Sequence, residues 1–126
     1  IKGATEISLY NDWVEDEVLD ELISAADIIC LPYNGATQSG VLFKAFEFGK
    51  PCIVTPDEHL LKQAQFGVWV CDGFDEFSIS EKIKFILDNP NEISTKRREL
   101  MQARDNYAAE VLSKSLFEYL RKWIIQ

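Results

Sequence analysis

Hydrophobic residues in this chain follow two alternating patterns: short continuous apolar runs and longer stretches with helical spacing. A short apolar run bounded by polar or turn-forming residues is typical of a strand that is covered on both faces. Apolar residues three to four positions apart predict an amphipathic helix. The predicted strands are Ile7–Tyr10, Ile28–Pro32, Cys52–Thr55 and Val68–Cys71. The predicted helices are Glu15–Ala26, Gly40–Phe48, Asp57–Gln65, Ser80–Leu87 and a terminal helical region over residues 94–125.

Several residues indicate where these helices begin and end. Gly49 is expected to form the left-handed C-terminal cap of the second helix, and Pro51 prevents that helix from resuming. Ser80 is expected to cap the helix that follows the last strand. We expect the terminal helical region to be broken near Asn106. In its second half the apolar residues recur every four positions, at Leu112, Leu116, Leu120 and Ile124.

Strands that alternate with helices indicate an α/β domain, here a Rossmann-like parallel sheet flanked by helices, with right-handed crossovers and C-terminal helices. The length of 126 residues fits a single domain over residues 1–126. Because the chain opens with Ile1 and no initiator Met, we expect this domain to be a segment of a longer protein. Ligands of such sheets bind beyond the carboxyl ends of the strands. The two loops of interest are therefore Asn11–Val14 and Tyr33–Val41.

Composition and charge narrow the choice of partners. The chain is 47% hydrophobic, enough to bury a core, and no apolar run is long enough to span a membrane. Its 13 basic and 21 acidic side chains give a net charge of -8, which argues against nucleic acid as a partner. Residues 1–92 hold 6 basic and 17 acidic side chains, whereas residues 93–126 hold 7 basic and 4 acidic ones. The basic part could contact anionic lipid or form the polar face of a helix.

The cysteines do not indicate a metal site. Cys30, Cys52 and Cys71 each lie in a short apolar run, no Cys-x-x-Cys pair exists, and His59 is the single histidine. Zinc sites need closely spaced Cys and His ligands. We expect three buried, reduced thiols that act as small hydrophobic residues, which suits a cytosolic compartment.

The loop before the second helix carries the strongest chemical signal. The first amides of a helix lack intrahelical partners, and the helix dipole makes this end positive. Gly40 lets an anionic group approach the backbone, and Thr37 and Ser39 could cap the helix or donate hydroxyls to a phosphate. Lys44 could add a positive charge one turn later. On spacing alone, the alternative that Ser39 is only an N-cap and Gly40 only a packing residue stays equally open. For Lys44 alone, a solvated surface lysine is the default interpretation.

Three stretches around this loop resemble glycosyltransferase family 4 in order, spacing and residue type. They are ADIICLPY at residues 26–33, ATQSGV at residues 36–41, and Lys44-Ala45 followed by FGKPCIVT at residues 48–55. The likeness extends from Ile7 to the helix before Asn89-Pro90. It implies the donor-binding, C-terminal half of a retaining GT-B enzyme that uses a nucleotide-diphosphate sugar.

The resemblance also implies a role for each part of the two loops. The diphosphate would be bound by Ser39, Gly40, Val41 and Leu42, with Lys44 as an additional charge. The donor sugar would lie beside Ala36, Thr37 and Gln38. The base and ribose would lie near Asn11, Asp12, Trp13, Val14 and Glu47. Trp13 could stack on the base or could simply shield the surface.

One family feature is missing from the loop. Family members carry two glutamates spaced Glu-x7-Glu, and the matching positions here are Ala36 and Lys44. The second glutamate normally holds the ribose, so a lysine at that position removes the expected contact. Glu47, one turn later, would reach the ribose only if the helix were tilted.

The resemblance implies transfer of a hexosyl group to a saccharide or lipid-linked acceptor, in bacterial polysaccharide biosynthesis, without a metal or other cofactor. The expected partners are the nucleotide-sugar donor and an N-terminal acceptor-binding domain that this chain lacks. No catalytic residue is visible, and His59 is expected to be a surface residue, so the chain alone should be inactive. The full-length enzyme is expected in the cytoplasm, with peripheral association at the inner face of the membrane left open.

Two further readings remain. The chain could be a non-catalytic, flavodoxin-like interaction or regulatory domain, such as a receiver domain. A receiver needs an aspartate at the end of a central strand, and Ile28–Pro32 has none, so Asp57 would have to serve. The chain could also be a degenerate donor domain that has kept the fold and lost the ligand.

Overall fold

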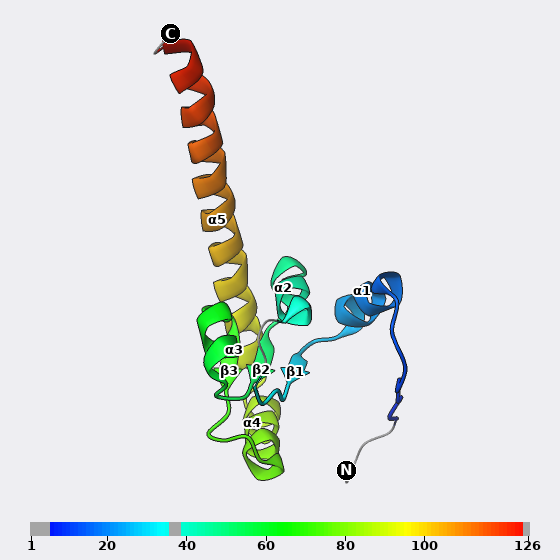
Figure 1. Cartoon of the computed structure of the whole chain (residues 1–126). Coiled ribbons are helices and arrows are strands. Elements are labelled where there is room, and N and C mark those ends of the chain that lie inside the picture. The colour runs from blue at the N-terminus through cyan, green and yellow to red at the C-terminus, as the bar shows by residue number, and fades with distance from the viewer. Residues whose placement is uncertain (1–5, 36–38, 125–126) are drawn as a thin grey trace.

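The computed structural model describes residues 6–35 and 39–124 and shows helices around a small sheet (Figure 1). In chain order the elements are α1 (Asp16–Ala25), β1 (Ile29–Leu31), α2 (Gly40–Glu47), β2 (Cys52–Val54), α3 (Glu58–Gln63), β3 (Val68–Val70), α4 (Glu76–Asp88) and α5 (Asn91–Ile124). The three strands form one parallel sheet in the order β1-β2-β3. The α/β class and the parallel sheet flanked by helices are therefore confirmed, and they are consistent with a Rossmann-like fold.

Helices pack on both faces of the sheet. On the α2–α3 face, buried Leu42 and Ala45 of α2 and Leu60 of α3 pack with strand residues. The strand residues that belong to this cluster are Leu31, Cys52 and Val54. On the α4–α5 face, Ile53, Trp69 and Cys71 pack with buried Ile86 of α4 and partly buried Ile93 of α5. Apolar contact on two sides explains why the strands read as continuous apolar runs rather than as alternating ones.

Helices α2, α3 and α4 each have a side-chain cap that fixes the start of the helix. Ser39 Oγ caps α2, Asp57 caps α3, and Asp75 caps α4 by accepting hydrogen bonds from the first free amides of the helix. Gly49 follows α2 with a positive φ of 67°, as the sequence predicts for its C-terminal cap. Gly67 has a φ of 65°, and a Cβ at this position would collide with the side chain of Leu100. Both turns are therefore restricted to glycine.

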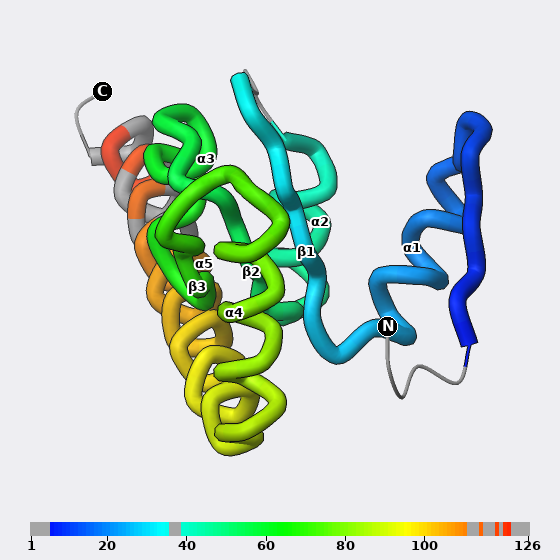
Figure 2. The backbone as a smooth tube through the Cα atoms, turned by 90° about the horizontal axis from the view of Figure 1, so that it is seen from below, coloured from blue at the N-terminus to red at the C-terminus, as the bar shows by residue number. Residues whose placement is uncertain are grey.

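The predicted strand over residues 7–10 is wrong. This segment has no strand pairing, and Ile7 and Leu9 are 73% and 85% exposed. Both views place α1 between this segment and the sheet (Figures 1 and 2). A short strand is not stable without a neighbour to pair with, so the apolar residues alone do not produce one.

Two predicted features of the carboxyl-terminal half are also wrong. Helix α4 begins at Glu76 rather than at Ser80, because the Asp75 carboxylate already caps it through the Ser78 amide at 2.8 Å. The Ser80 hydroxyl instead donates to the carbonyl of Phe77. Helix α5 runs through Asn106 without a break for 34 residues. It contains no Gly or Pro, and an asparagine alone costs a helix little.

Helix α5 packs on the sheet with its first turns and then extends far beyond the other elements (Figure 1). Near its start, Glu92 accepts a hydrogen bond from the indole of Trp69 at 3.1 Å, which ties α5 to β3. Over the part of the chain that the structure describes, no helix combines the length and apolar character needed to cross a membrane.

Candidate functional site

The candidate site is the start of α2, where the chain has left the carboxyl end of β1. Ser39 is 5% exposed, and its hydroxyl oxygen accepts a hydrogen bond from the Leu42 amide at 3.1 Å. The N-cap reading of Ser39 is thus correct as far as its side chain is concerned. The Leu42 amide, one of the expected phosphate donors, is used inside the protein.

Residues that follow β2 hold this loop in place. The Asp57 carboxylate accepts a hydrogen bond from the Gly35 amide at 2.7 Å, and the Thr55 hydroxyl donates to the Tyr33 carbonyl. Gln63 makes a two-way contact with Ser39: its side-chain oxygen accepts from the Ser39 amide at 3.1 Å, and its amide nitrogen donates to the Ser39 carbonyl at 2.8 Å. The backbone that enters α2 is therefore positioned by two neighbouring segments, and this preorganises its amides.

Thr55, Asp57 and Gln63 are parts of this site that the sequence pattern does not predict. A signal was available for two of them, because Thr55 and Asp57 come directly after a buried strand that is adjacent to β1. Carboxyl ends of adjacent parallel strands lie at one edge of a sheet. Gln63 lies at the end of α3, and no pattern in the sequence relates it to Ser39.

Space remains beside the first residue of α2. Gly40 is exposed, and a Cβ placed on it would have no atom within 4 Å among the described residues. Within residues 6–35 and 39–124, no group accepts a hydrogen bond from the amides of Gly40 or Val41. These two amides lie at the positive end of an eight-residue helix. The start of α2 thus has backbone donors next to open space, which is the arrangement that an anion requires.

Lys44 does not face this space. Its ammonium group forms an ion pair with the carboxylate of Asp20 in α1 at 2.5 Å, and the lysine side chain is 25% exposed. The hydrogen bond to Asp20 raises the pKa of Lys44 and keeps it charged. The lysine therefore joins α1 to α2, and a phosphate at the start of α2 would have to compete with Asp20 for it.

The remaining expected site residues are not brought together. Ala36, Thr37 and Gln38 lie outside the described residues. Asn11, Asp12 and Trp13 lie on the exposed segment before α1, with Trp13 90% exposed and Val14 partly covered. Both views show this segment on the side of α1 that faces away from the sheet (Figures 1 and 2). Glu47 is an exposed residue of the last turn of α2, far along the helix from Ser39.

The thiols form no site of their own. Burial raises the pKa of Cys52 to about 12, so this thiol stays protonated near neutral pH. Cys52 and Cys71 are buried as expected, but Cys30 is exposed, because no helix covers the edge strand β1 at this position on the α4–α5 face. Among the residues that the structure describes, no group of three His, Cys, Asp or Glu side chains could hold a metal ion.

The chemistry available at the start of α2 is therefore anion binding by backbone amides, next to a Ser39 backbone that Gln63 holds by two hydrogen bonds. Among the described residues of this region, the hydroxyls of Ser39 and Thr55 and the carboxylate of Asp57 are engaged in cap and loop hydrogen bonds. Comparisons of the chain with protein-family models, with curated proteins and with solved structures give no match.

Proposed function

We propose that this chain is the nucleotide-sugar donor-binding region of a retaining glycosyltransferase that transfers a hexosyl group to a saccharide or lipid-linked acceptor. In this proposal the isolated chain binds the donor diphosphate and does not catalyse transfer. The acceptor-binding half belongs to another part of the full enzyme. The basis for the sugar and the reaction is the sequence resemblance, and the basis for the diphosphate is the start of α2.

The observation that carries the proposal is the open backbone at Gly40. Within the described residues, its amide and that of Val41 face no acceptor, and no atom lies within 4 Å of the position of a Cβ at Gly40. Helix starts at the carboxyl end of a parallel strand bind phosphate through such amides. We call the amides of Gly40 and Val41 the Gly40 seat. Asp57 lies near the Gly40 seat, but its carboxylate already accepts hydrogen bonds from the amides of Gly35, His59 and Leu60, and these bonds offset its negative charge locally.

A titration with uridine diphosphate and guanosine diphosphate tests the proposal. Amide resonances of Gly40 and Val41 should shift on addition of nucleotide, and the shifts should saturate. Gly40→Val should weaken binding by about tenfold or more, because its side chain fills the space that a phosphate needs. The fold should survive, because no atom of the described residues lies within 4 Å of a Cβ at this position.

The matched control is Glu76→Val, which places the same side chain at the first residue of α4. It should leave nucleotide affinity unchanged. If Gly40→Val binds nucleotide as well as the parent chain does, the proposed seat is wrong.

A second candidate, a degenerate donor domain, is favoured by two observations. Lys44, the cation expected near the diphosphate, is paired with Asp20, and the Leu42 amide donates its hydrogen bond to Ser39 Oγ. In this case a folded chain shows no shift at Gly40 even at millimolar nucleotide. Lys44→Gln would not change that result, since the lysine would have no part in binding.

A further inference from the structure

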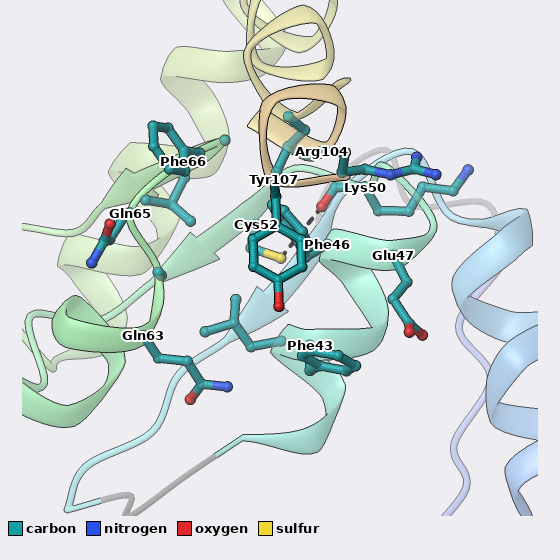
Figure 3. A pocket seen from close by; sticks show the side chains of 15 residues that line it. Phe43, Phe46, Glu47, Lys50, Cys52, Gln63, Gln65, Phe66, Arg104 and Tyr107 are labelled. Carbon is teal, nitrogen blue, oxygen red and sulfur yellow. Dashed lines mark hydrogen bonds between the residues drawn. The ribbon is translucent and has the colours of Figure 1, made fainter. Parts of the chain in front are cut away.

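A groove of 670 Å³ lies along α2 (Figure 3), and neither Gly40 nor Val41 is one of its lining residues. Its floor is apolar and buried, with Leu42, Cys52 and Leu100 among its residues. Its walls come from α2, from the segment between α3 and β3, and from α5. The groove therefore lies where three separate parts of the chain meet.

Exposed aromatic rings line the walls of this groove. Phe43 of α2 is 59% exposed, Phe66 before β3 is 47% exposed, and Tyr107 of α5 is 64% exposed. Figure 3 shows the ring of Tyr107 in front of the floor residue Cys52, with Phe43 and Phe66 on opposite sides. Aromatic walls over a buried apolar floor are typical of small-molecule sites, and the volume lies within their usual range of about 300–1,000 Å³.

Two cations stand at one end of the groove. Lys50, in the turn after α2, and Arg104 of α5 both line it, and their side chains extend in the same direction (Figure 3). Within residues 6–35 and 39–124, neither side chain forms an ion pair, whereas Lys44 and Arg97 do. Glu47 also lines this end, but its carboxylate points away from the two cationic groups (Figure 3).

The two cations could simply offset the negative end of the α2 dipole, since the Arg104 guanidinium lies 3.4 Å from the position of a Cβ on Gly49. That role does not account for the open aromatic groove beside them. In a chain of net charge -8, two unpaired cations at the end of an apolar groove match a ligand with an anionic group on an apolar body.

We infer that this groove binds a small soluble amphiphile whose aromatic or aliphatic body lies on the floor and whose phosphate or carboxylate contacts Lys50 and Arg104. The volume and the aromatic walls over a buried apolar floor favour a small molecule over a protein partner, whose interface would need a larger area. The inference does not depend on the proposed function, because Gly40 and Val41, whose amides would bind the diphosphate, do not line the groove. Gln63, which contacts Ser39, is shared by the two regions.

The test uses 1-naphthyl phosphate, with 2-(1-naphthyl)ethanol as its uncharged counterpart. Calorimetry should give one saturable site per chain for the phosphate, and binding should weaken as salt is added. The uncharged compound should bind at least about tenfold more weakly, since it lacks the charge-assisted contacts. Amide shifts should appear at Phe43, Val68 and Tyr107 rather than at Gly40 and Val41.

Variants separate the anionic contacts from the apolar ones. Arg104→Gln and Lys50→Gln should each reduce affinity about tenfold, and Arg98→Gln, an exposed α5 residue outside the groove, should not change it. Phe43→Ala should weaken the binding of both compounds. Phe77→Ala should weaken the binding of neither, because Phe77 is an exposed residue of α4 outside the groove. If Arg104→Gln alters the fold, Lys50→Gln still decides the question. Gly40→Val should leave this binding unchanged.

Several results would overturn the inference. These are no saturable binding at millimolar phosphate, equal binding of the uncharged compound, or full affinity in both cation variants. Binding to phosphatidylglycerol vesicles without binding of the soluble phosphate would indicate a membrane contact instead. Concentration-dependent self-association in sedimentation, with the groove amides protected from exchange, would indicate a second copy of the chain as the occupant.

Discussion

The edge strand β1 is buried on one face of the sheet and partly exposed on the other. On the α2–α3 face, Leu31 is 3% exposed and belongs to a buried cluster with residues of α2 and β2. On the α4–α5 face, its neighbour Cys30 is exposed, although Ile53 and Trp69 next to it in register are buried. Helices α4 and α5 cover β2 and β3 on this face and leave part of β1 open.

The difference shows that an apolar run does not guarantee two covered faces. The run over residues 28–31 has the same appearance as the run over residues 52–54, yet only the latter is buried at every position. A central strand gains cover from both sides, whereas an edge strand depends on which helices reach it. The following predictions test this difference, from the largest expected effect to the smallest.

Leu31→Ala should lower the free energy of unfolding by about 2–5 kcal/mol, because it leaves a cavity in the α2–α3 cluster. The measurement is urea denaturation at constant protein concentration. Leu61→Ala is the control, since Leu61 is 40% exposed and lies outside that cluster. Equal losses for the two variants would mean that the edge strand is no better covered on this face than the surface of α3.

The Cys52 thiol should make stability depend on alkaline pH. Its pKa is raised to about 12 by burial, against 9.0 for the ordinary thiol. Above pH 9 the unfolded chain releases this proton and the folded chain keeps it, so stability falls as pH rises between these values. At pH 10 the loss from this group is about 1.4 kcal/mol.

The pH test compares urea denaturation at pH 8 and pH 10 for the parent chain and for Cys52→Ala. The variant should show a smaller drop over this interval, because all other titrating groups are shared. A drop of the same size in both chains would contradict the buried, protonated state of Cys52.

Ser39→Ala should cost about 1 kcal/mol, the usual loss for an N-cap. The Leu42 amide loses its acceptor, and the start of α2 should then exchange its amide hydrogens faster. Ser80→Ala serves as the control, because Ser80 is an exposed residue inside α4 and not its cap. If both variants unfold at the same urea concentration, Ser39 does not stabilise α2.

Cys30→Ala should change stability by less than about 0.5 kcal/mol, as is usual for an exposed position. In the parent chain, a maleimide should modify Cys30 before it modifies Cys52 or Cys71, which are buried. Urea denaturation and mass spectrometry of the labelled chain check the two statements. A large loss of stability would mean that α4 or another element covers this part of β1 in solution.

Local signals account for most elements that the sequence predicted correctly. Gly49 and Gly67 end their segments with a positive φ, as glycine permits, and the apolar runs of β2 and β3 lie in the sheet. The failures share a cause. Residues 7–10 have the apolar pattern of a strand, but pairing needs a neighbour, and α1 stands between this segment and the sheet. Likewise, Asp75 and Ser80 are both suitable caps, and the sequence alone did not decide between them.

The candidate site was predicted in part for the same reason. Ser39 and Gly40 lie in a loop between a strand and a helix, so local chemistry identifies them. Gln63, Asp57 and Asp20 reach this region from other elements, and only distance in space relates them to it. The ion pair between Lys44 and Asp20 joins residues 24 positions apart in the sequence, and no local pattern indicates it.

The sequence by itself determined where most strands and helices form, because apolar spacing, caps and glycine turns act over a few neighbouring residues. Tertiary structure alone decided which of the helix-start amides stay open, which lysine is paired and where the aromatic groove forms. These features depend on side chains from distant segments that meet only after the helices have packed on the sheet, and burial and charge are set by that packing.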